Sequence, residues 1–429
     1  MPNTPNRIVI VGASLAGARA VHSVRSAGHD GPLTLIGAEP HLPYDRPPLS
    51  KEFLTGDNDP SSLALDPDGA YDELDVEVML STHAVGLDTD ARTIAVAPAA
   101  GGSAEMVPFD GLVIATGAAA RSLPGTEGVR GVHTLRTLDD AAAIREGLVA
   151  GARVAVVGGG FIGSEVAASA KARGCEVTVI EAARAPLVRG LGAEMGTRVG
   201  TLHSQNGVEL RLGVGVDGVL GTDRVEAVAM ADGSRIPADL VVVGIGVVPN
   251  TAWLEGSGLQ IDNGVVCDET LCCGPPGVYA VGDAARVPNG WLGPLAGSEP
   301  VRVEHWTAAV EHGMAVGRNL VAPAEAQPYN SVPFVWSDQY DARIQIAGHP
   351  DAGDDVEVLV GSVAGGTNAS IPNAGSPDPG RSFLAGYRRN GRLSAVMALD
   401  AIRPFVRFRR LLASHPSWDE ALELAATLN

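Results

Sequence analysis

The sequence predicts an α/β fold with two Rossmann-like domains and a C-terminal α+β domain. Two segments, Arg7–Gly17 (RIVIVGASLAG) and Arg153–Gly163 (RVAVVGGGFIG), look like copies of one unit, in which an apolar run enters a glycine-rich turn. From about Pro328 the pattern changes to alternating segments with aromatic residues, which is typical of an antiparallel sheet. The 429 residues are 45% hydrophobic, so the chain can form about two to four domains, each with its own core.

Each repeated unit continues as a strand–helix–strand pattern. After each glycine-rich turn, small and apolar residues at helical spacing lead to a second apolar strand, at Leu33–Gly37 in the first unit and at Glu176–Glu181 in the second. Connections of this kind pair their strands in parallel. Further strands are expected at Gly111–Ile114, Leu240–Val243 and Val278–Val281.

The carboxy-terminal part has a different sequence pattern. Five segments predict its antiparallel sheet: SVPFVWSD, RIQIAG, VEVLVG, SFLAGYRR and LSAVMAL. Arg403–Thr427 has a helical pattern. The stretch Gly361–Gly380 is rich in glycine, serine and proline, and we expect it to be a mobile loop.

Charge and composition argue against several classes of protein. The net charge of −19 disfavours nucleic acid or an anionic membrane as the main partner. No apolar run is long enough to cross a membrane, and the amino-terminal MPNTPNR lacks the apolar region of a signal peptide. The four cysteines have no spacing typical of a metal or iron–sulfur site. We therefore expect free thiols, a cytoplasmic location and no metal.

The second glycine-rich turn is a complete GxGxxG fingerprint. It consists of Gly158, Gly160, Phe161, Ile162 and Gly163. Such a turn places backbone N–H groups and a helix amino terminus against a pyrophosphate. Glu181 stands 18 residues after Gly163, where a carboxylate would bind a ribose diol and repel a 2′-phosphate. This unit is therefore expected to bind NAD rather than NADP.

The first glycine-rich turn departs from the fingerprint at one position. It consists of Gly12, Ser14, Leu15, Ala16 and Gly17, with serine in place of the middle glycine. Glu39 follows Gly17 by 22 residues, again at the spacing of a ribose-binding acid. A single GxGxxG is a weak signal. Two in tandem, each behind a strand and each with an acidic partner, predict two dinucleotide sites.

With these motifs the sequence resembles the FAD-dependent, NADH-oxidising ferredoxin reductases that serve bacterial oxygenases and cytochromes P450, within the glutathione-reductase-like flavoproteins. The resemblance spans nearly the whole chain. Its most specific stretches are HLPYDRPPLSK (41–51), HTLRTLDDA (133–141), GIGVVPN (244–250), YAVGDAA (279–285), VRVEHW (301–306) and VPFVWSDQY (332–340).

The resemblance implies two Rossmann-like dinucleotide-binding domains, one for FAD and one for NAD. Residues 1–118 and 245–327 would form a discontinuous FAD domain, residues 119–244 an inserted NAD domain and residues 328–429 the C-terminal domain. NADH would reduce FAD by hydride transfer. Electrons would then pass singly to an iron–sulfur ferredoxin that feeds a cytochrome P450 or Rieske-type oxygenase.

The resemblance also implies roles for single residues. Glu39 would bind the adenosine ribose of FAD, Asp283 would hold the ribityl chain, and Trp306 would lie beside the isoalloxazine. Gly282, which precedes Asp283, is also expected to contact the cofactor. Gly246 would permit the approach of the nicotinamide. Further residues expected along the FAD are Arg46, Lys51, Ala84, Thr116, Gly117 and Arg136.

Lys51 and Glu165 match a lysine–glutamate pair that meets near flavin N5 in the family that the chain resembles. Only two of the 31 basic residues are lysines, and Lys51 stands in a proline-rich turn. A compact ammonium there would neutralise negative charge as the hydride arrives. We therefore expect these two residues to be catalytic.

Two other functions stay open. A disulfide reductase, peroxidase or NADH oxidase of the same fold would need a redox cysteine at the flavin, but Pro43–Leu54 contains none. Cys272 and Cys273 lie far downstream. A flavin-bearing signalling protein would also be reduced by NADH, but it would pass electrons to an added ferredoxin only slowly.

Because the chain has a net charge of −19, an acidic ferredoxin would need a local positively charged surface on which to dock. Arg403, Arg407 and Arg410 recur at i, i+4 and i+7 and would share one face of a helix. The opposite face would carry Phe405, Phe408 and Leu412. We expect the arginines to attract the ferredoxin; the alternative is a solvated helix whose arginines serve only solubility.

Overall fold

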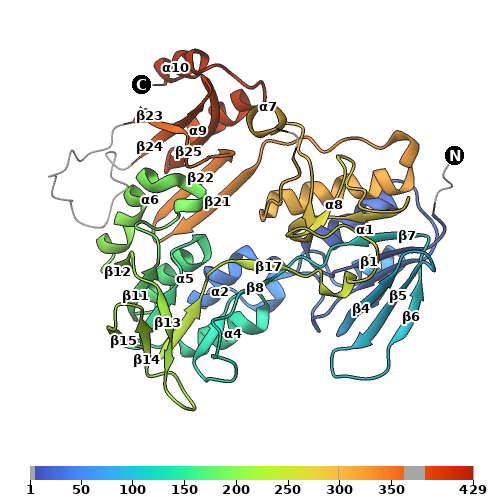
Figure 1. The fold of residues 1–429 in the computed structure, drawn as a ribbon, viewed down its shortest axis with the longest axis horizontal. Helices are drawn as coiled ribbons and strands as arrows, with labels where there is room; N and C mark the ends of the chain where they lie inside the picture. Colours follow the sequence, from blue (N-terminus) through green and yellow to red (C-terminus); the bar gives the residue numbers. More distant parts are fainter. Residues whose placement is uncertain (1–4, 298, 362–381, 429) are drawn as a thin grey trace. The chain divides into compact units, whose positions relative to one another are not determined.

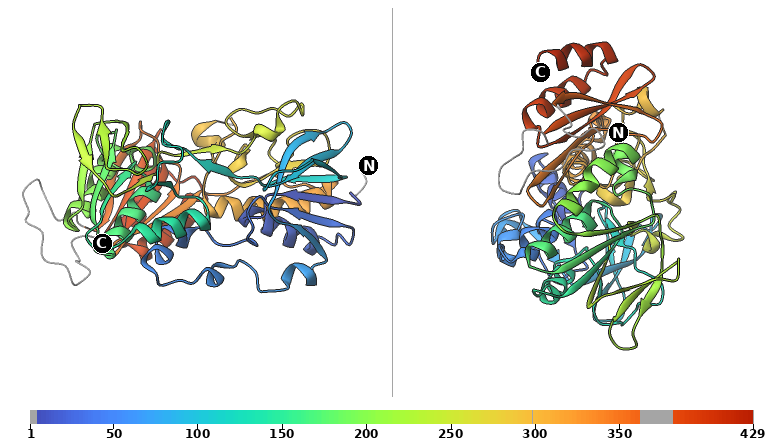
Figure 2. Two further views of the ribbon diagram at one scale, coloured as in Figure 1. Left: turned by 90° about the horizontal axis from the view of Figure 1, so that it is seen from below. Right: turned by 90° about the vertical axis from the view of Figure 1, so that its left-hand side faces the viewer.

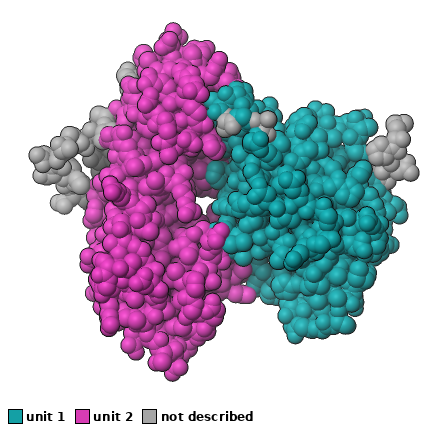
Figure 3. Space-filling view, in the orientation of Figure 1, with its two compact units in different colours: residues 1–45, 60–119, 247–333 teal, residues 46–59, 120–246, 334–429 magenta. Residues whose placement is uncertain are grey.

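The computed structural model describes residues 5–297, 299–361 and 382–428, and the expected loop Gly361–Gly380 lies outside them apart from Gly361. The chain divides into two compact units, coloured separately in Figure 3. Unit 1 comprises Met1–Asp45, Pro60–Ala119 and Val247–Pro333. Unit 2 comprises Arg46–Asp59, Ala120–Gly246 and Phe334–Asn429.

Unit 1 is built on a five-stranded parallel sheet with the strand order β19–β7–β1–β2–β3 (Figure 1). These strands are β1 (Ile8–Val11), β2 (Leu33–Ile36), β3 (Val76–Met79), β7 (Gly111–Ile114) and β19 (Val278–Ala280). Ile8 of β1 lies opposite both Leu33 and Gly111. Every residue of β1, β2 and β7 is buried, as expected for parallel strands covered on both faces.

Two helices of unit 1 pack together through small residues. They are α1 (Leu15–Ser26) and α8 (Trp306–Val321). A Cβ atom added to Gly313 would lie 2.6 Å from the carbonyl oxygen of Ala16, and one added to Gly317 would lie 2.5 Å from the Ser23 side chain. Ser23 Oγ also donates to the Met314 carbonyl at 2.6 Å. These contacts hold α8 along α1, from Ala16 in its first turn to Ser23 near its end.

The rest of unit 1 is an antiparallel sheet and short elements. The sheet consists of β4 (Thr82–Asp88), β5 (Thr93–Pro98) and β6 (Glu105–Pro108), and it lies beside the parallel sheet in Figures 1 and 2. The short elements include α3 (Ala70–Glu73), β18 (Val265–Val266), β20 (Ala285–Arg286) and α7 (Gly293–Ala296). Strands β8 (Ala118–Ala120) and β17 (Val247–Pro249) pair where the chain changes units.

Unit 2 contains a second five-stranded parallel sheet, in the order β12–β11–β10–β16–β9. Its strands are β9 (Val132–Thr134), β10 (Arg153–Val157), β11 (Glu176–Glu181), β12 (Glu209–Leu212) and β16 (Leu240–Val243). Its helices are α4 (Leu138–Gly147), α5 (Phe161–Ala172) and α6 (Val188–Gln205). A small antiparallel sheet of β13 (Val216–Leu220), β14 (Ala227–Met230) and β15 (Arg235–Pro237) completes this part.

The carboxy-terminal part of unit 2 is an antiparallel sheet in the order β21–β22–β25–β24–β23. Its strands are β21 (Phe334–Gln339), β22 (Ala342–Gly348), β23 (Asp355–Gly361), β24 (Phe383–Arg389) and β25 (Arg392–Leu399). Buried residues of α6, including Leu191, Met195 and Val199, share one core with Ile344 and Met397 of this sheet. The sheet and the second Rossmann-like domain therefore form one compact unit.

The segment Arg403–Thr427, for which a helical pattern is predicted, forms two helices. They are α9 (Ile402–Leu412) and α10 (Trp418–Ala426). His415 between them has a φ of 52°, which a continuous helix does not allow. Ser417 then caps α10 in a reciprocal capping box with Glu420.

Segment 46–59 belongs to unit 2. It carries η1 (Pro47–Ser50) and α2 (Glu52–Thr55). Phe53 and Leu54 are fully buried, and the Arg145 guanidinium lies 4.4 Å from the ring centre of Phe53. The domain boundaries predicted from the sequence place this segment with residues 1–118, whereas it packs with unit 2. The position of Lys51 is thus set by unit 2.

The predicted fold class agrees with this architecture, since both βαβ units and the carboxy-terminal antiparallel sheet are present. The sheets β4–β6 and β13–β15 were not predicted. No helix in the described part of the chain is long and apolar enough to cross a membrane. Among the same residues, no group of three or more histidine, cysteine or acidic side chains could hold a metal ion.

Candidate active site

Three turns meet at the carboxyl edge of the parallel sheet in unit 1. Gly12 has a φ of +123°, and a Cβ atom added to it would lie 2.1 Å from the Ala115 carbonyl oxygen. A Cβ atom on Gly17 would lie 2.0 Å from the Gly12 carbonyl oxygen, and one on Gly282 would lie 3.1 Å from the Ala16 side chain. No side chain caps the amino end of α1. These features fit a dinucleotide pyrophosphate, which binds at such a bare helix end.

Ser14 does not disturb this turn. Its φ of −137° and ψ of −165° are extended values that any residue adopts. Gly160, at the same position of the second fingerprint, is also extended, with a φ of −77° and a ψ of −177°. Gly12 and Gly158 have φ values of 123° and 108°, so these are the positions that need glycine.

The turn after β7 is held by Asn250. Asn250 Nδ2 donates to the Thr116 carbonyl and Thr116 Oγ1 donates to the Asn250 carbonyl, both at 2.9 Å. The Asn250 backbone N–H donates to the Gly117 carbonyl at 2.9 Å. Thr116 and Gly117 are predicted to line the FAD. Asn250, which holds their turn, was not predicted to be a site residue, although it is the last residue of the GIGVVPN motif.

The turn after β19 is held by His312 and Arg302. The Gly282 N–H donates to His312 Nδ1 at 3.2 Å, and Arg302 Nη1 donates to the Asp283 carbonyl at 3.3 Å. Burial lowers the pKa of His312 to about 4, so its neutral ring can accept at Nδ1. Neither residue was singled out from the sequence, because nothing local marks a buried histidine as the partner of a turn 30 residues away.

The other residues expected to contact FAD in unit 1 have defined surroundings. Tyr44 OH donates to Glu39 Oε2 at 2.6 Å, which fixes the acid that follows the first βαβ unit. Trp306 Nε1 donates to Asp45 Oδ1 at 2.7 Å, so the indole is oriented at the start of α8. Ala84 lies on β4 and packs against the core of unit 1.

The second fingerprint turn lies at the carboxyl edge of the parallel sheet in unit 2. A Cβ atom on Gly158 would lie 2.3 Å from the Gly244 carbonyl oxygen, and one on Gly163 would lie 2.1 Å from that of Gly158. Gly160 faces open space. Phe161 and Ile162 begin α5, where Ile162 is 47% exposed. The close packing and the open middle position fit a second dinucleotide.

Glu181 is fixed beside this turn. Its Oε2 accepts from the Gly159 N–H and its Oε1 from the Ala183 N–H, both at 2.8 Å. Each carboxylate oxygen can accept a further bond, so the group can still bind ribose hydroxyls. The predicted acid and the predicted glycine turn therefore meet.

Arg189 is a candidate site residue that the sequence analysis missed. A Cβ atom added to Gly246 would lie 3.7 Å from Arg189 Nη1. Arg189 is exposed at the start of α6, after Leu187, whose N–H donates to the Gly159 carbonyl at 2.9 Å. A guanidinium thus lies beside the residue that was expected to admit the nicotinamide. No periodicity or motif spacing marks this arginine.

Lys51 and Glu165 form a buried ion pair within unit 2. Lys51 Nζ lies 2.7 Å from Glu165 Oε2, and the two side chains are 13% and 3% exposed. Lys51 Nζ also donates to the Pro47 carbonyl at 3.1 Å. Glu165 lies on α5, the helix that begins at the second fingerprint. The lysine and glutamate that the sequence paired by resemblance are in contact.

Burial and hydrogen bonding act on Glu165 in opposite directions. Burial is the larger influence and raises the pKa of its carboxyl above the usual value, while the Lys51 ammonium and the hydroxyls of Ser50 and Ser337 oppose that rise. Arg46 and Arg136, which were expected along the FAD, are joined in the same unit, since Arg46 Nη1 donates to the Arg136 carbonyl. Three of the residues expected to contact FAD, Arg46, Lys51 and Arg136, are therefore carried by unit 2.

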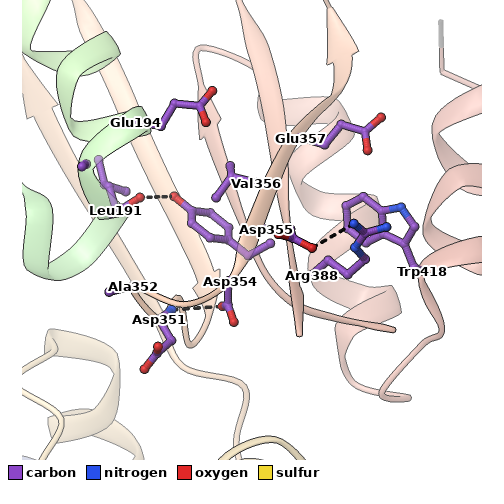
Figure 4. Close-up of a pocket in the computed structure, with 13 residues that line it drawn as sticks. Leu191, Glu194, Asp351, Ala352, Asp354, Asp355, Val356, Glu357, Arg388 and Trp418 are labelled. Atoms are coloured by element: carbon purple, nitrogen blue, oxygen red, sulfur yellow. Dashed lines mark hydrogen bonds and ion pairs between the residues drawn. The ribbon is translucent and has the colours of Figure 1, made fainter. Parts of the chain in front are cut away.

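A cavity of about 550 Å³ lies elsewhere in unit 2, between the start of α6 and the carboxy-terminal sheet (Figure 4). Its charged lining is Glu194, Asp351, Asp354, Asp355, Glu357 and Arg388. Arg388 Nη2 pairs with Asp355 Oδ2 at 2.9 Å. The excess of carboxylates would repel nucleotide phosphates. None of the predicted cofactor residues lines this cavity, so we assign it no part in cofactor binding.

The four cysteines form no disulfide. Cys175, Cys267 and Cys273 are buried, and Cys272 is half-buried. The hydrogen bond to Cys267 and burial raise the pKa of the Cys273 thiol, and burial raises that of Cys272. A redox cysteine needs a lowered pKa. The adjacent pair Cys272–Cys273 therefore gives no support to disulfide chemistry.

Helix α9 has the two faces that the sequence predicts. Its buried residues are Phe405, Phe408 and Leu412. Arg403, Arg407 and Arg410 are exposed, as are Ile402 and Val406. Arg409 differs, since its guanidinium lies 4.2 Å from the ring centre of Phe334. The exposed arginines with interleaved apolar residues have the composition of a protein–protein interface.

Comparison with known proteins identifies the family. Residues 6–313 match the pyridine nucleotide-disulphide oxidoreductase family and residues 334–426 match the reductase C-terminal family. Rhodocoxin reductase of Rhodococcus erythropolis is 39% identical over 84% of this chain and 82% of its own length. The putidaredoxin reductase in a covalent complex with putidaredoxin is 30% identical, with a TM-score of 0.87 and coverage of 99% of both chains. The ferredoxin reductase for the CYP199A2 system of Rhodopseudomonas palustris is 32% identical, with a TM-score of 0.87 over 99% of this chain and 100% of that one.

The chain belongs to the pyridine nucleotide-disulphide oxidoreductase family, in the branch of the ferredoxin reductases of oxygenase and cytochrome P450 systems. The expected resemblance, fold class, oxidoreductase activity and use of FAD and NAD(H) are thereby confirmed. The expected function as a ferredoxin reductase is also confirmed.

Proposed function

We propose that this chain oxidises NADH and delivers the electrons singly to an iron–sulfur ferredoxin, which passes them to a cytochrome P450 or Rieske-type oxygenase. The observation that carries the proposal is the buried Lys51–Glu165 pair on the helix that begins at the second fingerprint. When bound, FAD would accept a hydride from NADH and release its two electrons one at a time.

We assign FAD to unit 1 and NAD to unit 2. The FAD domain would comprise about 1–118 and 245–327 without segment 46–59, which belongs to unit 2. The NAD domain would comprise 119–244 and the C-terminal domain 328–429. The first glycine turn, the turn held by Asn250 and the turn held by His312 and Arg302 would bind the FAD. The turn at Gly158–Gly163 would bind the pyrophosphate of NADH, and Glu181 its adenosine ribose. The carboxylate of Glu181 would repel the 2′-phosphate of NADPH.

Lys51 would hold a positive charge where the reduced cofactor gains negative charge. Glu165 would orient the ammonium and supply its counter-charge, because a buried charge without a partner is costly. Arg46 and Arg136 would extend the same positively charged side of the site. The chain would thus act by positioning and electrostatics while the cofactors supply the redox chemistry.

The ferredoxin would dock on the exposed arginine face of α9, Arg403, Arg407 and Arg410. Rim charges of this kind act mainly on the rate of encounter. Among the solved relatives, putidaredoxin reductase has been trapped with putidaredoxin. We also propose a cytoplasmic location, which the unpaired thiols support because disulfides are rare in reducing compartments.

Steady-state reduction of cytochrome c by NADH tests the proposal. The purified protein should be yellow, contain one FAD per chain and reduce cytochrome c rapidly only when an iron–sulfur ferredoxin is added. Slow transfer to every ferredoxin tried would favour a signalling flavoprotein. Loss of activity after thiol alkylation would favour disulfide chemistry.

A further inference from the structure

Glu165 receives three hydrogen bonds, and Lys51 supplies only one of them. Ser50 Oγ donates to Oε2 at 2.5 Å, and Ser337 Oγ donates to Oε1 at 2.7 Å. Ser50 ends η1, whereas Ser337 lies on β21, the first strand of the carboxy-terminal sheet. Both serines are buried. Two parts of the chain distant in sequence therefore place hydroxyl groups on one carboxylate.

The local bonding favours donation of both hydroxyl protons to the carboxylate. Ser50 Oγ lies 2.5 Å from Glu165 Oε2 but 3.4 Å from its other acceptor, the Pro47 carbonyl. Gln339 Nε2 donates to Ser337 Oγ at 3.2 Å, which leaves the single proton of Ser337 for Glu165. Ser169 Oγ, on the same helix as Glu165, donates to the Ser50 carbonyl at 2.7 Å. This bond fixes Ser50, and with it the neighbouring Lys51, against α5.

We propose that Ser337, together with Ser50, is a positioning residue for the Lys51–Glu165 pair: the two hydroxyls hold Glu165 as a carboxylate, and the carboxylate holds Lys51. A hydroxyl that donates stabilises the ionised acid and does nothing comparable for the neutral one. A buried carboxylate that loses donors takes up a proton, and the ion pair with Lys51 is then lost. This inference rests on the proposed function, because it assigns a task to the carboxy-terminal sheet within the same site.

The charged groups on the neighbouring elements bind other partners, and Lys51 is the charged partner of Glu165. Asp338 on β21 pairs with Arg343 at 2.6 Å. Glu181 on β11 accepts from the Gly159 and Ala183 N–H groups. Among the described residues, Lys51 is the charged side chain that contacts Glu165. A change in the titration of Glu165 can therefore be attributed to its serine donors.

The test is an infrared titration of the FAD-bound protein, in which a protonated carboxyl gives a carbonyl band. The band of Glu165 is assigned by its loss in Glu165→Gln. In Ser337→Ala the midpoint should move to higher pH by about one unit, the size expected for one hydrogen bond to a charged group. The acid limb of the pH profile for FAD reduction by NADH, followed by stopped flow, should move by the same amount.

Ser394→Ala is the matched control. Ser394 lies fully buried in the same sheet and donates to the Asp354 carboxylate at 2.9 Å, so its loss reports the cost of a buried serine–carboxylate bond. In Ser394→Ala the pH midpoint of the Glu165 carbonyl band should equal that of the wild type. Ser337→Thr keeps a hydroxyl and should restore the wild-type midpoint. An unshifted midpoint in Ser337→Ala, or an equal shift in Ser394→Ala, would overturn the proposal.

Two further results separate this inference from the proposed function. If Ser337→Ala does not fold, Ser50→Ala decides the matter, since it must shift the midpoint upward for the proposal to stand. If the wild type is not reduced by NADH, the proposed function fails, while the infrared titration still measures what Ser337 does to Glu165.

Discussion

The ammonium of Lys51 lies 2.7 Å from the carboxylate of Glu165, although the two residues are 114 positions apart in the chain. Replacing Lys51 with methionine should slow FAD reduction by NADH about 100-fold, the size of effect seen when one charge-stabilising group is removed. FAD content should stay unchanged. Stopped-flow measurement of flavin absorbance checks the rate.

Lys171→Met is the natural control, because Lys171 is the other lysine and its Nζ contacts only the Gly207 carbonyl among the hydrogen bonds described. It should behave as the wild type. Glu165→Gln combined with Lys51→Met should cost less than the sum of the single changes, because the two side chains act as one pair. Additive costs would show that they act separately.

Glu181→Gln should narrow the preference for NADH over NADPH about tenfold, because it removes the carboxylate that repels a 2′-phosphate. Glutamine keeps an acceptor for one of the two N–H groups that Glu181 now binds. The ratio of kcat/KM for the two cofactors measures the effect. Glu176→Gln, at the exposed other end of β11, should leave that ratio unchanged. A wild type that prefers NADPH would refute the part given to Glu181.

Arg189→Gln should raise the KM for NADH about tenfold, because one ion-pair or charge-assisted hydrogen bond to the nucleotide is lost. Transfer from the reduced flavin to ferredoxin should not change. Arg198→Gln serves as the control, since Arg198 lies on the same helix and pairs with Glu194 at 3.1 Å. An unchanged KM in Arg189→Gln would remove this guanidinium from the NADH site.

Reversing Arg407 and Arg410 to glutamate should raise the KM for ferredoxin without altering FAD reduction by NADH. Ferredoxin-dependent activity of the wild type should also fall as salt rises, because charges are screened beyond about 8–10 Å at physiological ionic strength. Reduction of small neutral quinones should change little. The control reverses Arg211 and Arg235, two exposed arginines on β12 and β15. An equal effect in both double variants would indicate a general charge effect and no docking site.

His312 should make FAD retention sensitive to acid. Burial lowers the pKa of His312 in the folded protein to about 4, below its usual 6.5, so its contribution to stability is present above pH 6.5 and lost as the pH falls toward 4. The free energy of unfolding should fall by about 3 kcal/mol over this pH range. Protonation at Nδ1 also removes the acceptor of the Gly282 N–H, so FAD should be released over the same range, as measured by flavin fluorescence.

His203 provides the comparison. Burial lowers the pKa of His203 to about 4 as well, but this residue lies in unit 2 and bonds Tyr340 at 2.7 Å. His203→Gln and His312→Gln should both flatten the pH dependence of urea unfolding. Only His312→Gln should change the pH at which FAD is released. Identical FAD release in the two variants would contradict the assignment of His312.

Local patterns in the sequence determined much of this protein. The positions of β1, β7, β11 and β16, the two glycine turns and the two faces of α9 all follow from periodicity and from glycine at positive φ, which act within about 20 residues of chain. Lys51 and Glu165 were named through the family resemblance. Their pairing was an expectation taken from resemblance.

The tertiary structure decided which groups surround these residues. Ser337 reaches Glu165 across 172 positions of sequence, His312 binds the Gly282 turn, and Arg189 lies beside Gly246. It also decided that Lys51 belongs to unit 2, because Phe53 and Leu54 bury their side chains there. No local pattern encodes such contacts: a serine or histidine has the same propensities wherever it packs, and its partner is set by the burial of apolar side chains elsewhere in the fold.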